Sequence, residues 1–334
     1  MQPARFLAAL LPLFFFATEA KASPASAGQV IKVDGSSTVF PISEAVSEEY
    51  QREEPGAKVT VGVSGTGGGF KKFVAGEIDI VDASRPIKAS EAEQAAKNGI
   101  TFFELPIAYD ALSIVVNPKN TWANDLTVKE LAKIWAPESQ GKIMKWSDVR
   151  PAFPDKPLKL FGAGTDSGTF DYFTEAIVGK EKASRGDYTS SEDDNVIVTG
   201  VMGNDGALGY FGVAYYESNK SRIRAVPIDD EDAGNGAGPQ LPSEQTVVAG
   251  TYRPLSRPLF IYVRRDALER PEVQKYVAFY LKNVPELSKD VGYIPLPAQL
   301  MTLVQARLQD GRVGSMYGGK VTSTMTLQEA LIQR

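Results

Sequence analysis

Three short segments rich in serine, threonine and glycine contain the residues of this chain best suited to hold a ligand. They are Gly35-Ser36-Ser37-Thr38 (the first turn), Ser64-Gly65-Thr66-Gly67-Gly68-Gly69 (the second turn) and Thr165-Asp166-Ser167-Gly168-Thr169 (the third turn). Each follows an expected strand and precedes an expected helix, whose unpaired N–H groups and dipole attract an anion. Small residues let an oxyanion reach the backbone, and hydroxyls add donors. Because serine and threonine are also ordinary helix N-caps, the prediction of a small-anion site depends on all three turns together.

The composition excludes several other kinds of site. The 334 residues include no histidine and no cysteine, which removes imidazole bases, thiol nucleophiles, disulfides and nearly all zinc chemistry. No EF-hand loop is present either, and we expect no metal and no cofactor. The net charge of -5 gives no support to nucleic-acid binding. An anion site in this chain must therefore use local donors.

Residues 1–27 have the pattern of a cleavable signal peptide. Arg5 gives a charged start, residues 6–17 are apolar, and Ala25-Ser26-Ala27 fits a cleavage site, with Ala20-Lys21-Ala22 as a competing one. The apolar stretch is shorter than the roughly 20 residues that span a membrane, and no later run approaches that length. We expect an exported, periplasmic protein whose mature chain does not insert into the membrane.

Strand and helix patterns alternate through the first hundred residues. The expected strands are 30–33, 58–63 and 77–81, and the expected helices are 39–50, 70–75 and 90–98. This alternation predicts an α/β fold with a largely parallel sheet. In such sheets ligands bind beyond the carboxyl ends of strands, which is where the three turns fall.

Two apolar segments, 111–116 and 259–263, are candidates for crossings between two lobes. Between them lie an expected helix over 127–135, an expected strand over 158–162 and the third turn. If the chain leaves one lobe and later returns, the first lobe is 28–112 plus 258–334 and the second is 113–257. The alternative is two consecutive α/β domains. The acidic, glycine-rich segment 229–242 is interpreted as a surface loop, and 326–333 as a short helix or a frayed tail.

Ser84-Arg85-Pro86 ends another expected strand and adds a guanidinium to the hydroxyl-rich turns. Arg85 could hold a tetrahedral oxyanion by two parallel hydrogen bonds, which a lysine cannot do; the alternative is a surface salt bridge. The usual nucleotide motifs do not fit, because a Walker loop and a dinucleotide fingerprint both fail at Phe70. A nucleophile elbow fails at Thr66.

Five motifs in order resemble the phosphate-binding proteins of bacterial ABC importers (the PstS family), over nearly all of the expected mature chain. They are Asp34 to Pro41, Ser64 to Gly69, Asp79 to Pro86, Gly164 to Phe170 and Asn204 to Tyr210. The resemblance implies a two-lobed periplasmic binding protein of type II, each lobe a mixed sheet flanked by helices. Such a monomer closes around one inorganic phosphate in the cleft and delivers it to the membrane permease.

By motif, the resemblance places phosphate contacts at Ser37, Thr38, Ser64, Ser167, Gly168 and Thr169. From their residue types and positions we also predict phosphate contacts at Thr66, Ser84, Arg85 and Asp166, with Ser36, Gly65 and Asp82 as secondary candidates. The chain departs from better-known members in two places: Ser84-Arg85 stands where they have Ser-Asp, and Gly162-Ala163-Gly164 where they have an arginine. We expect Arg85 to replace that arginine.

A carboxylate in the site would explain selection of phosphate over sulfate. Phosphate near neutral pH carries a hydroxyl that can donate a hydrogen bond, whereas sulfate has none and would face an unpaired like charge. Asp166 is the first candidate, although it could also be a helix N-cap, and Asp82 is the second.

The predicted function is therefore extracytoplasmic phosphate binding, without catalysis. The alternatives are binding of another oxyanion (sulfate, molybdate or tungstate), a secreted phosphatase or esterase using Ser37 or Ser167, and a surface adhesin that keeps the fold.

Overall fold

A computed structural model describes residues 30–165, 167–319 and 325–333; the predicted signal peptide and Asp166 lie outside the described residues. The strands are β1 (Ile31–Gly35), β2 (Val59–Val63), β3 (Ile80–Ala83), β4 (Phe102–Val116), β5 (Leu126–Thr127), β6 (Lys159–Ala163), β7 (Thr189–Ser191), β8 (Ala207–Gly212), β9 (Arg224–Ala225), β10 (Ile228–Asp229), β11 (Ser256–Arg264) and β12 (Ile294–Pro295). The α-helices are α1 (Phe40–Glu53), α2 (Gly65–Val74), α3 (Ala89–Lys97), α4 (Val128–Trp135), α5 (Trp146–Val149), α6 (Gly168–Phe173), α7 (Asp194–Met202), α8 (Val213–Asn219), α9 (Glu244–Val248), α10 (Pro271–Asp290), α11 (Ala298–Gln309) and α12 (Leu327–Ile332).

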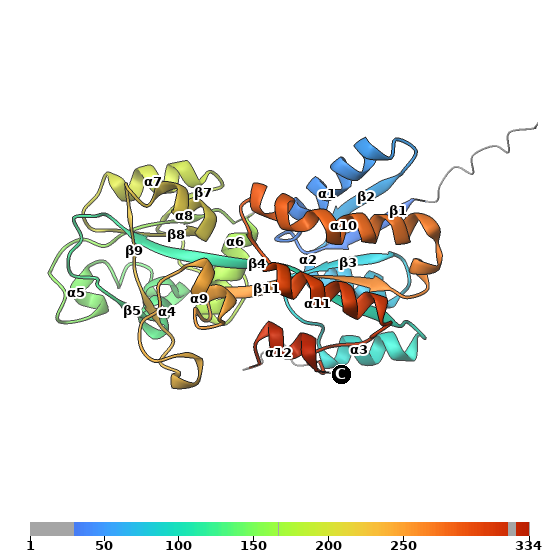
Figure 1. Ribbon diagram of the computed structural model, residues 1–334. Helices are drawn as coiled ribbons and strands as arrows, with labels where there is room; N and C mark the ends of the chain where they lie inside the picture. Colours follow the sequence, from blue (N-terminus) through green and yellow to red (C-terminus); the bar gives the residue numbers. More distant parts are fainter. Residues whose placement is uncertain (1–29, 166, 320–324, 334) are drawn as a thin grey trace, which may run out of the picture.

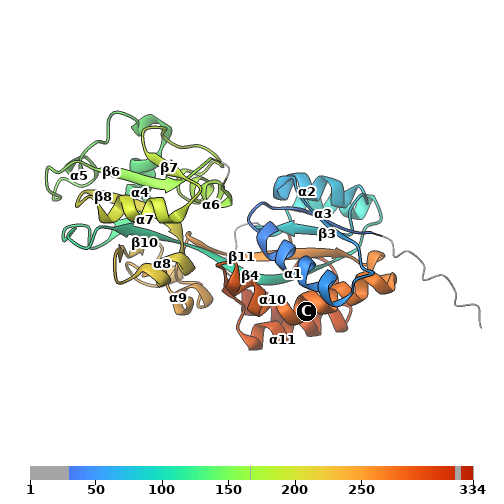
Figure 2. The same cartoon turned by 90° about the horizontal axis from the view of Figure 1, so that it is seen from above.

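The elements form two lobes joined by long strands (Figure 1). One lobe contains β1 to β3 with α1, α2, α3, α10 and α11, and the other contains β6 to β8 with α4 to α8. Seen from above, β4 and β11 run from one lobe into the other (Figure 2). The fold is a two-domain mixed α/β fold.

The sheet is mixed rather than largely parallel. Its strand order is β2-β1-β3-β11-β4-β8-β6-β7. The pairs of β1 with β2 and β3, and of β6 with β7 and β8, are parallel. In the middle, β11 is antiparallel to both β3 and β4, and β4 is antiparallel to β8. The mixed sheet implied by the family resemblance is therefore confirmed. The largely parallel sheet expected from the alternation alone is wrong at its centre, because the chain re-enters the first lobe in the opposite direction.

Strand β4 is much longer than the predicted crossing segment. Its 15 residues are all buried. Phe102 to Ala111 pair with β11, and Leu112 to Val116 pair with β8. One continuous strand thus belongs to the sheets of both lobes, which fixes where the lobes meet.

Helix α2 begins five residues before the predicted helix of 70–75 and includes the glycines of the second turn. A Cβ placed on Gly69 would lie 2.6 Å from Cα of Gly35 and 2.7 Å from Cγ2 of Val81. Only glycine lets α2 lie so close to β1 and β3. Glycine usually signals a loop in a sequence, and this is why the pattern placed the helix start too late.

Other local predictions hold. The helix expected over 127–135 is α4, and Thr127 and Glu130 form its capping box with bonds of 3.1 and 2.9 Å. The tail forms a short helix, α12, whose Leu327 and Leu331 are buried. Among the described residues, no helix is long and apolar enough to cross a membrane.

Candidate functional site

The first and second turns meet at one edge of the sheet. Gly35 of β1 pairs with Val63 of β2 on one side and with Asp82 of β3 on the other. Because these parallel strands end side by side, the residues that follow them leave the sheet together. They line a cavity of about 380 Å³. The lining residues are Ser36, Ser37, Thr38, Ser64, Gly65, Thr66, Gly67, Gly68, Lys71, Ser84, Arg85, Lys88, Asp171, Tyr172, Glu175, Glu181 and Arg257.

Hydrogen bonds hold the first two turns in place. The backbone N–H of Ser36 donates to the carbonyl of Asp82 at 3.0 Å, and that of Thr38 donates to Oγ of Ser36 at 3.2 Å. In the second turn, Ser64 Oγ donates to Asp34 at 2.5 Å. Thr66 Oγ1 lies 3.0 Å from Ser84 Oγ. These bonds hold Ser36, Thr66 and Ser84 at the cavity lining, whereas the one hydrogen of the Ser64 hydroxyl is donated to Asp34.

The third turn lies against the first turn rather than on the cavity lining. A Cβ placed on Gly168 would lie 2.8 Å from Oγ1 of Thr38, so only glycine permits this approach. Ser167 caps α6 by accepting a hydrogen bond from the N–H of Thr169 at 3.1 Å. Asp166 is not described, and its predicted role stays a prediction. From this lobe, Asp171, Tyr172, Glu175 and Glu181 face the cavity instead.

Arg85 lines the cavity but already has an ionic partner. Its Nη1 and Nη2 lie 2.9 and 2.8 Å from the two carboxylate oxygens of Glu91, and its Nη1 also donates to the carbonyl of Pro86 at 3.1 Å. The salt bridge given as the alternative for Arg85 is thus present, with the arginine side chain only 13% exposed. The two parallel hydrogen bonds expected for an anion go to a carboxylate of the protein.

Arg257 was not among the predicted site residues. Its guanidinium carbon lies 3.6 Å from the centre of the Tyr172 ring, and its Nη2 lies 3.3 Å from Oγ1 of Thr38. Its Nε is 3.4 Å from Asp110, and its Nη1 is 3.8 Å from Glu175. Arg257 thus contacts the first turn and α6 at once.

The sequence carries a signal for Arg257. Ser256-Arg257-Pro258 repeats the Ser-Arg-Pro tripeptide of 84–86. Since β11 runs antiparallel to β3, with Phe260 opposite Ala83, the start of β11 lies beside the end of β3. The sequence does not give the direction of β11, so it could not place Arg257 beside the cavity.

The carboxylates around the cavity differ in their surroundings. The pKa of Asp171 is raised to about 6, mainly by burial and to a smaller extent by Glu181, while Lys182 and Arg257 oppose the shift. The Oδ1 atom of Asp171 is buried without a hydrogen-bond partner among the described residues. Burial also raises the pKa of Asp110, which the Arg257 guanidinium opposes. Asp171 is thus a lining acid whose Oδ1 makes no hydrogen bond in the described part of the chain but lies 3.8 Å from the Lys182 ammonium.

Asp82, the second acid predicted for the site, points away from the cavity. It is fully buried, and its Oδ1 accepts a hydrogen bond of 2.8 Å from Ser43, which in turn contacts the hydroxyl of Tyr280 at 2.9 Å. Side chains alternate between the faces of a strand, and Asp82 faces α1 and α10. The structure does not bring it to the cavity lining.

Asp82 should instead govern stability against pH. Burial, with a smaller contribution from Asp34, raises its pKa to about 7, while the Ser43 hydrogen bond lowers it; the unfolded value is about 3.9. Between these values the folded chain keeps a proton that the unfolded chain has lost, so the free energy of unfolding falls as pH rises. In Asp82→Asn, this fall should be smaller in urea unfolding measured from about pH 5 to about pH 8. Asp290→Asn, at the exposed end of α10, is the control; equal pH dependence in wild type and Asp82→Asn would contradict the assignment.

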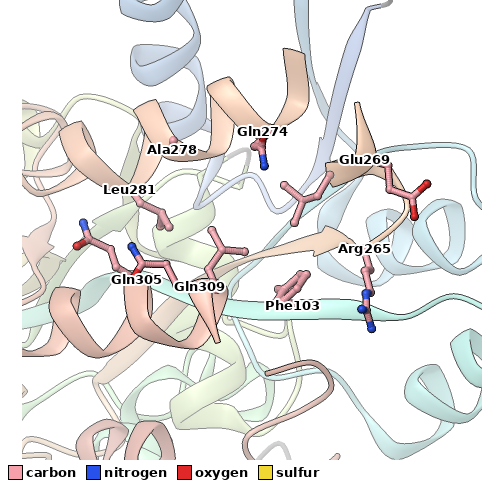
Figure 3. A pocket seen from close by; sticks show the side chains of 10 residues that line it. Phe103, Arg265, Glu269, Gln274, Ala278, Leu281, Gln305 and Gln309 are labelled. Carbon is pink, nitrogen blue, oxygen red and sulfur yellow. The ribbon is translucent and has the colours of Figure 1, made fainter. Parts of the chain in front are cut away.

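A larger hollow of about 740 Å³ lies elsewhere, between α10 and α11 (Figure 3). Its lining includes the apolar Leu281, Leu308 and Phe103 and the polar Gln274 and Gln305. None of the predicted site residues lines it. Size alone does not make it the anion site, because the hydroxyl-rich turns converge on the smaller cavity.

The family model and the similar known proteins agree with one another. The family model described as a PBP superfamily domain matches residues 20–284. The chain is 48% identical to Protein SphX of Synechococcus elongatus over 94% of this chain and 90% of that protein. It is 37% identical to the phosphate-binding protein PstS of Staphylococcus saprophyticus over 84% of each. Its fold matches the crystal structure of a possible phosphate binding protein from Planctomyces limnophilus with a TM-score of 0.81 and 49% identity, over 86% of this chain and 100% of that chain.

Proposed function

Since the chain belongs to the PBP superfamily and, within it, to the family of the phosphate-binding protein PstS, we propose that it binds inorganic phosphate in the cavity beside the first two turns. The observation that carries this proposal is the convergence of two Ser/Thr/Gly turns and Arg257 on one cavity. Hydroxyls and helix N-termini supply neutral donors, and Arg257 supplies the positive charge.

The cleft geometry suggests how phosphate would be enclosed. The first lobe comprises residues 28–112 plus 258–334, and the second comprises residues 113–257. Strands β4 and β11 cross between them. Ser37, Thr38, Ser64, Thr66 and Ser84 act from the first lobe, with Ser36 and Gly65 as secondary contacts. Ser167, Gly168 and Thr169, which lie against the first turn in the structure, contact the anion from the second lobe, which moves about these strands. Arg257 touches both sides and should draw them together around the anion.

The proposal also covers where the protein acts, its membrane partner and its lack of catalysis. The protein acts as a monomer outside the cytoplasm, after removal of residues 1–27, and delivers phosphate to the permease of an ABC importer. It performs no catalysis, because the chain has no histidine to activate Ser37 or Ser167. A chromogenic phosphate ester should therefore not be turned over, with or without added divalent metal.

Calorimetric titration with phosphate and with sulfate tests the proposed function. We expect phosphate to bind at least about a hundredfold more tightly, since like-charge juxtaposition costs several kcal/mol and about 1.4 kcal/mol is tenfold. Absence of phosphate binding, or equal affinity for sulfate, molybdate or tungstate, would overturn the proposal.

Asp171 is the described acid that we propose as acceptor of the phosphate hydroxyl, with Asp166 retained as a candidate. Asp171→Asn should reduce phosphate-over-sulfate discrimination by about tenfold, because the amide can donate to sulfate where the carboxylate repels it. Since its pKa is raised to about 6, discrimination should also narrow as pH falls through that value. Asp290→Asn is the matched control, and unchanged discrimination in Asp171→Asn would assign the acceptor to another residue.

A further inference from the structure

The cavity is larger than one phosphate needs. Its volume of about 380 Å³ corresponds to roughly a dozen water molecules at about 30 Å³ each. A phosphate ion presents only four oxygens around its phosphorus. Part of the cavity therefore remains available for a second group, and the residues around that part determine its chemistry.

Most charged residues on the lining already have a partner of opposite charge. Arg85 pairs with Glu91 at 2.8 Å. Arg257 lies near Asp110 and Glu175, as described above. Asp171 lies 3.8 Å from Lys182. Glu181 interacts with the side chain of Asp171. Two charged lining residues remain after these are set aside, Lys71 and Lys88.

Lys71 and Lys88 are the cations available to a ligand. Both are exposed, and neither side chain makes an ion pair or a hydrogen bond with another residue in the described part of the chain. Lys71 is on the same face of α2 as Gly67 and Gly68, which line the cavity. Lys88 immediately precedes α3. An ammonium is a compact point charge that suits a phosphoryl group.

We propose that this cavity also binds inorganic pyrophosphate, a class of ligand with two linked phosphoryl groups. One phosphoryl group occupies the site formed by the first two turns and Arg257, and the other contacts Lys71 and Lys88. This inference rests on the proposed phosphate site and extends its range to condensed phosphates.

Calorimetric titration with sodium phosphate and with phosphate-free sodium pyrophosphate, both in the presence of a chelator, tests the inference. Wild type should bind both ligands. Lys71→Gln/Lys88→Gln should lose about tenfold in pyrophosphate affinity, because charge-assisted hydrogen bonds are removed, with phosphate affinity nearly unchanged. The control Lys58→Gln/Lys97→Gln removes two exposed lysines outside the cavity and should bind both ligands as wild type does.

The possible failures are distinguishable. Binding of phosphate without pyrophosphate would overturn the inference and leave the phosphate site intact, whereas binding of neither would overturn the proposed function. Equal loss of both ligands in the double variant, or pyrophosphate binding that does not depend on the lysines, would overturn the second subsite. Methyl phosphate serves as a further arm: binding as tight as that of pyrophosphate would show that spare volume, rather than charge, accepts the second group.

Discussion

Arg257→Ala is expected to weaken phosphate binding by about tenfold to a hundredfold, because a hydrogen bond to a charged group contributes about 1.5–3 kcal/mol. Arg257 is 14% exposed, stacks on Tyr172 and reaches Thr38. It therefore places a desolvated positive charge beside the first turn without losing it to a bidentate carboxylate. Isothermal titration with phosphate at fixed ionic strength measures the loss.

Two comparison variants make this result specific. Arg257→Lys keeps the charge but loses the planar stacking and the paired donors, so it should recover only part of the affinity. Arg85→Ala/Glu91→Ala removes the other cavity arginine together with its carboxylate and should have a smaller effect than Arg257→Ala. A larger loss in that double variant would make Arg85 the anchor, as the sequence predicts. Thermal unfolding of Arg257→Ala checks that Asp110, left buried without its partner, does not destabilise the fold.

Gly69→Val is expected to lower the free energy of unfolding by about 2–3 kcal/mol, because an overpacked interior site forces backbone shifts. Its Cβ would meet the backbone of Gly35 at 2.6 Å and the side chain of Val81 at 2.7 Å. Helix α2 must then move away from the sheet and displace the second turn, so phosphate affinity should fall as well. Urea unfolding gives the first quantity and calorimetry the second.

Gly56→Val is the matched control for this change. A Cβ at Gly56 meets nothing within 4 Å, so stability should remain within about 0.5 kcal/mol of wild type. If Gly69→Val unfolds at the same urea concentration as Gly56→Val, the close contact of α2 with β1 and β3 is not required.

The ligand-binding turns could be predicted because their signals are local. Helix starts favour serine, threonine and small neighbours within a few positions. Ser167 caps α6 with its side chain, whereas Ser64 precedes α2 without a side-chain capping bond. Thr127 caps α4 as Ser167 caps α6. The alternation of strands and helices likewise depends on short periodicities, so it predicted the α/β class but not the antiparallel pairs at the centre of the sheet.

The composition of the site depended on contacts between residues far apart in the chain. Arg257 reaches Thr38 across 219 positions because β11 returns antiparallel to β3. Arg85 is drawn to Glu91 on the next helix, and Asp82 is turned toward Ser43 rather than the cavity.

The sequence by itself therefore determined which segments offer hydroxyls and backbone N–H groups at helix starts. Only the tertiary structure decided which charged side chains face the cavity. Strand direction and side-chain facing are set by long-range packing, and no local pattern of residues encodes them.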